Sequence, residues 1–199
     1  MRGFRRVRGG FEGAGEPAEL QLIANLMKDV VITLGEDPDQ LDEVDDDPLA
    51  ALEKELDGAL LPSSDPALAL LLRDMSEDPA EAEEMRFLAE AGVRSAKVAN
   101  LGAVYRRLTS SDGTFVIPTD EAPAWLGAIN DLRLVLAARL DIDSAERAEQ
   151  VTDRATYLAE NPGAVDSDEP DHQLALLYAM MSWWQESLLD AMRFSMPRG

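Results

Sequence analysis

The stretch from Ala124 to Ile142 places the strongest constraint on how this chain folds. If this stretch is a helix, apolar side chains cover almost its whole circumference. Such a helix has too little polar surface to expose one side to water. We therefore predict a central helix at about residues 121–141, packed against several others. The pattern favours a mainly α-helical single domain over residues 1–199, a helical bundle around that central helix.

Weaker patterns predict the other elements. Asp-Pro pairs at 47–48, 65–66 and 78–79 are suited to an N-cap followed by proline in the first helical turn. Gly35 fits the position just after a helix, and Ser144 fits an N-cap. The predicted helices span residues 16–34, 48–58, 66–75, 79–108, 145–159 and 171–194. Residues 4–8 and 114–117 are predicted strands, which we expect to pair with each other as a minor two-stranded β element.

Residues 36–47 are predicted to be a solvated acidic linker. They hold eight carboxylates among twelve residues, and runs of like charge repel one another and favour solvent. A calcium loop would need a glycine and a terminal glutamate in register, and neither is present. Both ends of the chain are expected to be disordered or loosely held.

The charge of the chain bears on its partners and its compartment. Its 39 acidic residues against 18 lysines and arginines give a net charge of −21, which repels phosphate backbones and anionic membranes. The exception is a short basic cluster of Arg2, Arg5, Arg6 and Arg8. No apolar run reaches the ~18 residues that a membrane span needs, and no secretory signal follows the basic start. We therefore expect a cytoplasmic protein that makes no membrane contact and does not bind nucleic acid directly.

Residue types that carry enzyme chemistry are scarce. The chain has no cysteine and one histidine, His172, which is expected to be a surface or capping residue. Neither a nucleophile elbow nor a phosphate-binding glycine loop is present. The sequence therefore predicts a non-enzymatic protein with no metal and no cofactor.

Polar residues inside the apolar helices are the candidate site. They form either a pocket or partner surface, or a buried network of salt bridges and amides that fixes how the helices cross. We favour the network, with ion-pair partners for the central helix on the 79–108 helix, above all Glu84 and Arg86. The residues concerned are Glu84, Arg86, Arg94, Lys97, Asn130, Asp131, Arg133 and Arg139.

Trp183 and Trp184 form a second candidate. Neighbouring residues on a helix point about 100° apart, so both indoles cannot face one core layer equally. One is expected in the core, and the other in an exposed apolar patch that a partner could cover.

Taken together, these residues resemble an actinobacterial family of proteins of unknown function, whose genes usually lie next to that of the Clp protease adaptor ClpS. The resemblance covers nearly the whole chain. It depends above all on Trp125-Leu126 followed by the run from Ile129 to Leu134 and by Arg139-Leu140. Weaker matches are the FRR…GG start, Asp47-Pro48-Leu49, the helix that carries Glu84 to Phe87, Arg94 and Lys97, and Trp184-Gln185-Glu186.

The resemblance implies a regulatory role. Members of the family have been linked to the regulation of transcription, and one has been proposed as an oxidative-stress regulator acting with an RNA polymerase sigma factor. A sigma factor or the proteolysis machinery is therefore the implied partner. This chain lacks cysteine, so a thiol switch proposed for relatives cannot operate here.

These observations lead to three functional hypotheses. The first is a non-enzymatic cytoplasmic regulator that acts through protein–protein contacts, in a transcriptional stress response if the resemblance holds. The second is a direct DNA-binding transcriptional regulator, which a basic face would favour. The third is a small-molecule binder or enzyme, which a deep pocket lined by Asn130, Asp131 or Arg133 would favour. The sequence leaves the oligomeric state open.

Overall fold

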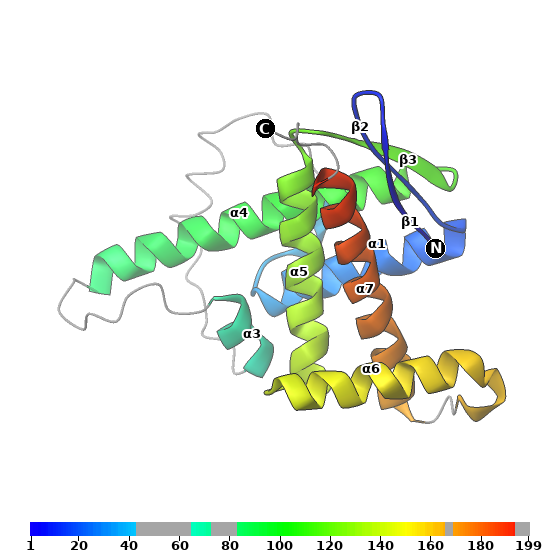
Figure 1. The fold of residues 1–199 in the computed structure, drawn as a ribbon. Coiled ribbons are helices and arrows are strands. Elements are labelled where there is room, and N and C mark those ends of the chain that lie inside the picture. Colours follow the sequence, from blue (N-terminus) through cyan, green and yellow to red (C-terminus); the bar gives the residue numbers. More distant parts are fainter. Residues whose placement is uncertain (43–64, 73–82, 166–168, 194–199) are drawn as a thin grey trace.

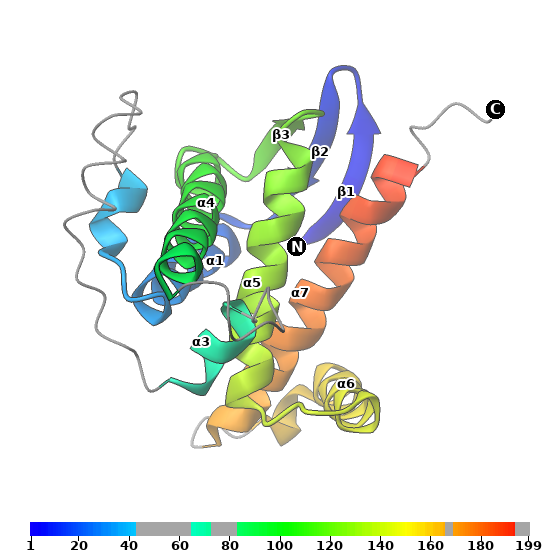
Figure 2. The same cartoon turned by 90° about the vertical axis from the view of Figure 1, so that its left-hand side faces the viewer.

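The central helix of the fold is α5 (Ala122–Arg139), in a computed structural model that describes residues 1–42, 65–72, 83–165 and 169–193. Figure 1 shows α5 crossing α4 (Glu83–Thr109), and Figure 2 shows α5 between α4 and α7 (Pro170–Arg193). Its contacts extend to α3 (Pro66–Leu71) and α1 (Pro17–Thr33). Ile129, Leu132 and Leu136 are at most 3% exposed, which confirms the predicted central helix.

The β element contains three strands, not two. β1 (Arg2–Val7) pairs antiparallel with β2 (Gly10–Ala14), which pairs antiparallel with β3 (Thr114–Pro118). The order β1-β2-β3 keeps the two predicted strands apart, so the prediction that they pair with each other was wrong. A β-carbon on Gly10 would lie 1.9 Å from the Ile117 carbonyl oxygen. Glycine therefore lets β2 fit between β1 and β3. Because glycine has a low strand propensity, the sequence of β2 does not resemble that of a typical strand.

Several helix boundaries follow the predicted signals. Gly35 has φ +84°, and the NH groups of Gly35 and Glu36 donate to the carbonyls of Ile32 and Val31 at 2.9 and 3.1 Å. These bonds satisfy the last carbonyls of α1. Asp65 accepts a bond from the NH of Ala67 at the start of α3. Ser144 likewise caps α6 (Ala145–Glu160).

The predicted acidic linker is partly structured. Its first part forms the 3-10 helix η1 (Pro38–Asp42), in which Leu41 is fully buried and packs with the core. This corrects the expectation of a solvated loop for residues 36–42, because a single apolar side chain anchors the segment despite its carboxylates. Residues 43–47 and the predicted helix at 48–58 lie outside the described residues, as does Asp78-Pro79.

Four aromatic rings join the sheet to the helices. Phe4 stacks on Trp184, and Phe115 stacks on Trp125, with centroid distances of 4.9 and 5.2 Å. The two stacked pairs cross almost at right angles, since the Phe4–Trp125 and Phe115–Trp184 interplanar angles are 82° and 83°. Edge-to-face contacts of this kind add to the stabilisation from burial. This aromatic cluster fixes β1 and β3 against α5 and α7, the helix that carries the tryptophan pair.

His172 was predicted to be a surface or capping residue, and the structure corrects the surface position. Its side chain is 7% exposed in the first turn of α7. It contacts Arg154 of α6, and its Nε2 lies 2.9 Å from the Glu169 carboxylate. The residue is buried because α6 packs against α7.

A separate finding concerns membranes: none of the helices in the described ranges is both long and apolar enough to span one.

Candidate functional site

The tryptophan pair on α7 divides between the core and the surface. Trp184 is fully buried in the aromatic cluster, whereas Trp183 is 46% exposed. This division confirms the prediction that one indole is core and the other is exposed. A half-exposed indole leaves a large apolar area in contact with water, and such residues are frequent anchors of protein interfaces.

Trp183 lies against the edge strand β1. A β-carbon built on Gly3 would lie 3.3 Å from Cζ2 of Trp183 and 3.1 Å from Cβ of Ser187. The NH of the next residue, Phe4, donates to the Ser187 hydroxyl at 3.1 Å. Glycine at position 3 therefore lets the strand backbone approach α7 closely, with the indole beside it. Figure 2 shows β1 running alongside α7.

The same strand and its turn carry a group of exposed arginines. Arg5 pairs with Glu12 of β2 at 2.6 Å. Within the described part of the chain, Arg2, Arg6 and Arg8 make no ion pair with another residue. We use the name Arg–Trp surface for Trp183 and the exposed arginines of the adjacent strand and its turn, Arg2, Arg5, Arg6 and Arg8. It is a basic, partly apolar area on a chain of net charge −21.

Asp131 carries the main buried charge of the central helix. It is 2% exposed, and its Oδ1 lies 2.5 Å from Nζ of Lys97 on α4. Burial raises the pKa of this carboxyl group, against the opposing effect of Lys97, because a charged form is disfavoured away from water. The prediction of a partner on the 79–108 helix is thus confirmed for Asp131, although that partner is Lys97.

Arg133 turns to the other side of the central helix. It donates to the Ser182 hydroxyl at 2.9 Å and to the side-chain oxygen of Gln185, both on α7. Its guanidinium also lies over the Tyr178 ring, 5.5 Å from the centroid. The prediction of a carboxylate partner for Arg133 on the 79–108 helix was therefore wrong. Side chains two positions apart on a helix point about 200° apart, so Asp131 and Arg133 face different neighbouring helices.

The other predicted polar residues are dispersed. Arg94 is 5% exposed and bonds Glu90 at 2.8 Å, while its Nε has no acceptor among the described residues. Arg139 pairs with Asp65, the N-cap of α3, at 2.6 Å, and Asn130 is half-buried. Glu84 and Arg86 belong to α4, but their side chains lie outside the described part, so their predicted role as partners stays a prediction. The described side chains do not converge on one place.

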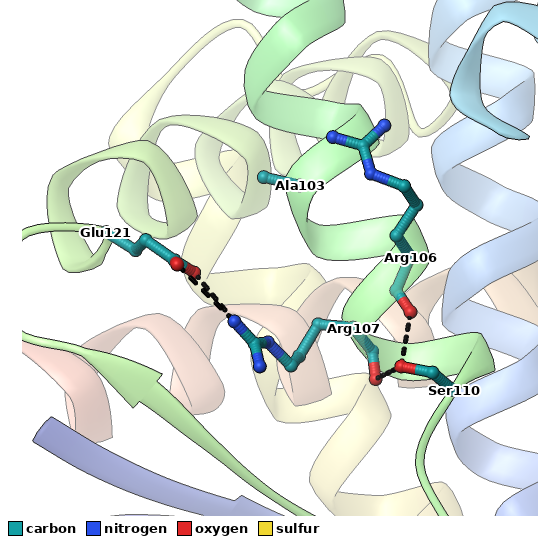
Figure 3. Close-up of a pocket in the computed structure, with 5 residues that line it drawn as sticks. All are labelled: Ala103, Arg106, Arg107, Ser110 and Glu121. Atoms are coloured by element: carbon teal, nitrogen blue, oxygen red, sulfur yellow. Dashed lines mark hydrogen bonds and ion pairs between the residues drawn. The ribbon is translucent and has the colours of Figure 1, made fainter. Parts of the chain in front are cut away.

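One surface hollow was not predicted from the sequence. Figure 3 shows its lining residues, Ala103, Arg106, Arg107, Ser110 and Glu121. Arg107 reaches both Glu121 oxygens at 3.3 and 3.4 Å, and the Ser110 hydroxyl donates to the Arg106 carbonyl at 2.7 Å. None of the polar residues predicted as a site lines it. The hollow lies between the end of α4 and the residue before α5, which β3 separates in the sequence.

Comparison with known protein families gives a match over almost the whole chain. The family model DUF2017, described as a domain of unknown function, matches residues 1–192. No curated protein and no solved structure matches the chain. Since the family model extends from the first strand to the last helix, the protein that carries the Arg–Trp surface and the Lys97–Asp131 pair belongs to the DUF2017 family.

Proposed function

We propose that this protein is a non-enzymatic regulator that binds another protein through the Arg–Trp surface. The observation that carries the proposal is the position of Trp183, a 46%-exposed indole against the strand that holds Arg2, Arg5 and Arg6. Tryptophan and arginine, together with tyrosine, are enriched among side chains that dominate binding energy. The presence of exposed arginines on the strand that lies against Trp183 supports a docking role.

The chemistry of the surface defines the kind of partner. Guanidinium groups bind carboxylates through paired hydrogen bonds, and an indole needs an apolar group to cover it. The partner segment is therefore acidic and carries at least one large apolar side chain. Because the remainder of this chain is strongly negative, an acidic partner would be repelled elsewhere and directed to the Arg–Trp surface.

The wider role is proposed from the resemblance described above. A regulator of transcription under stress would act in the cytoplasm on an RNA polymerase sigma factor or on the proteolysis machinery. These two give the first partners to test. Both are protein partners, as the Arg–Trp surface requires.

A binding experiment with a matched control tests the proposal. The purified full chain is titrated against the purified candidate partner, and Trp183→Ala is compared with Tyr157→Ala. Tyr157 lies on α6 and is 58% exposed, so its replacement removes a similar exposed ring at another surface. Trp183→Ala should weaken binding at least about tenfold, as expected for a central anchor, and Tyr157→Ala should not. Equal effects of the two variants would refute the proposal.

Direct DNA binding is the second candidate, because the exposed arginines of β1 could also bind phosphates. The net charge of −21 opposes this. Any affinity would come from the Arg2–Arg8 segment alone and would fall steeply with salt. Sequence-specific binding in a gel-shift assay, at sub-micromolar protein and physiological salt, would favour DNA over a protein partner.

A further inference from the structure

Arg133 is a half-buried cation whose contacts are all neutral. Within the described ranges its guanidinium makes no ion pair, although the chain carries 39 acidic residues. Its acceptors are the Ser182 hydroxyl and the Gln185 side-chain oxygen. A charged group that is partly removed from water is stabilised best by an opposite charge. The positive charge of Arg133 is therefore available to an anionic ligand.

The surrounding groups hold the guanidinium in one orientation. Nε donates to Ser182 at 2.9 Å, and Nη1 donates to Gln185. The Ser182 hydroxyl itself donates to the Tyr178 carbonyl at 2.8 Å, and the Tyr178 ring lies against the guanidinium. Both N–H groups of Nη2 have no acceptor in the described part of the chain. A donor group fixed in this way loses less conformational freedom on binding than a mobile surface arginine does.

Asn130 supplies further unused donors on the same side of α5. It lies three residues before Arg133, about 60° away around the helix and one turn nearer its start. Long helical side chains lean towards the start of their helix, which brings the guanidinium towards the turn that holds Asn130. The Asn130 side chain is half-buried and has no hydrogen-bond partner among the described residues. A single anion can therefore accept hydrogen bonds from both side chains.

The neighbouring carboxylates do not occupy this position. Asp131 follows Asn130, but its Oδ1 is bound to Lys97 of α4. Glu186 follows Gln185 on α7 and is exposed, and it makes no ion pair with Arg133. The site thus lacks an acidic group of its own, while the net charge of −21 opposes any incoming anion. A small anion should bind with an affinity in about the millimolar range.

We propose that Arg133 and Asn130 bind an oxyanion, the carboxylate or phosphate group of a small ligand, where α5 lies beside α7 (Figure 2). Arginine suits this role because its charge is permanent and its N–H groups bond strongly to charged oxygens. Trp183 points about 200° away from Gln185 around α7. The site is therefore separate from the Arg–Trp surface and does not depend on the proposed function.

Side-chain NMR of the full, 15N-labelled chain tests the site. Inorganic phosphate and acetate are titrated separately to about 50 mM at constant ionic strength. The Nε–H signal of Arg133, identified by its loss in Arg133→Lys, should shift to saturation with a Kd of about 1–10 mM. Saturation by phosphate alone would identify a phosphate site, and saturation by acetate alone a carboxylate site. A linear response or no response to both anions would overturn the proposal.

Asn130→Ala separates a ligand site from a structural network. Asn130 has no described partner to lose, so thermal unfolding without the anion should be unchanged. The affinity for the anion, read from the Arg133 signal, should fall about threefold to tenfold, as expected for one hydrogen bond. Unchanged affinity would overturn the proposal. A lower unfolding temperature without the anion would assign the amide to structure and would also overturn it.

Arg147 provides a matched control for the charge. It is also half-buried and makes no ion pair among the described residues, but its Nη2 donates to the Leu140 carbonyl. Leu140 is the C-cap of α5, where the negative end of the helix dipole offsets the charge of Arg147. Arg133→Met should abolish saturation, read from the Asn130 side-chain NH2 signal, and Arg147→Met should keep the affinity within about twofold. Equal effects of the two variants would refute the site.

Discussion

Lys97 and Asp131 form an ion pair between α4 and α5, with 2.5 Å between Nζ and Oδ1, and the side chains are 20% and 3% exposed. The pair crosses the interface between two long helices at a point where the carboxylate is out of contact with water. Burial raises the pKa of Asp131 despite its cationic partner, because the desolvation of this carboxylate outweighs the attraction of Lys97.

A double-mutant cycle should show this cost. Lys97→Met leaves a buried carboxylate unpaired and should lower the free energy of unfolding by about 3–5 kcal/mol. Asp131→Leu leaves Lys97, whose ammonium can reach solvent, so the loss should be smaller, about 1–3 kcal/mol. The double variant Lys97→Met/Asp131→Leu should come within about 1 kcal/mol of the wild type or exceed it. Urea unfolding measures all four proteins; additive losses would contradict the interpretation.

Arg133 should contribute less to stability than a buried ion pair would. Its bonds go to the neutral groups of Ser182 and Gln185, so Arg133→Met leaves no carboxylate unpaired. We expect a loss of about 1–3 kcal/mol in thermal or urea unfolding. Arg133→Lys should recover only part of it, because an ammonium cannot reproduce the planar contact over Tyr178. If partner binding disappears while stability is unchanged, Arg133 belongs to a functional site instead.

The pair of Asp65 and Arg139 should make stability depend on acid pH. The hydrogen bond from Arg139 lowers the pKa of Asp65, so the folded state favours the ionised carboxylate. This contribution is therefore present above the unfolded pKa of about 3.9 and is lost as the pH falls through the folded value. Both side chains are partly exposed, at 22% and 44%, so the effect is under about 1 kcal/mol. The stability of Arg139→Gln in urea unfolding should fall below wild type at pH 7 and match it in strong acid.

The capping role of Asp65 can be separated from its charge. Asp65→Asn keeps a side-chain acceptor for the Ala67 NH and removes the negative charge that pairs with Arg139. Asp65→Ala loses both and should cost about 1 kcal/mol more. Thermal unfolding at neutral pH measures the difference. Equal losses would show that the cap contributes nothing.

The core position of Leu132 predicts a large loss of stability on truncation. It is 1% exposed, so Leu132→Ala should cost about 2–5 kcal/mol through lost burial and the cavity left behind. Leu22→Ala, at a site 45% exposed, serves as the control and should change stability by less than about 0.5 kcal/mol. Similar losses would mean that α5 is not the centre of the fold.

Sequence patterns predicted the features that depend only on which residues are buried. The apolar periodicity of residues 124–142 identified α5, and the helical angle between Trp183 and Trp184 separated core from surface. β2 was missed because its sequence GFEGA has two glycines and low strand propensity. Gly13 is required there, since a β-carbon would lie 2.6 Å from the Phe115 ring. The residues of β2 therefore form a strand because they pair with β1 and β3, and not because they have a high strand propensity.

The partners of the polar side chains could not be predicted in the same way. Asp131 pairs with a residue 34 positions away, and Arg133 with one 52 positions away. Which neighbour each one meets depends on the order in which the helices surround α5. The sequence marks these side chains as needing partners, but only the topology decides which partners they reach.

The difference in solvent exposure among the tryptophans makes their fluorescence a reporter of both binding and unfolding. Of its three indoles, Trp125 and Trp184 are fully buried among phenyl rings, and Trp183 is open to solvent. A water-soluble quencher such as acrylamide should therefore reach the emission of Trp183 and leave that of the other two almost unchanged. Loss of quenching on mixing with a protein would report coverage of the Arg–Trp surface without any label, and the buried pair would report unfolding in the same spectrum.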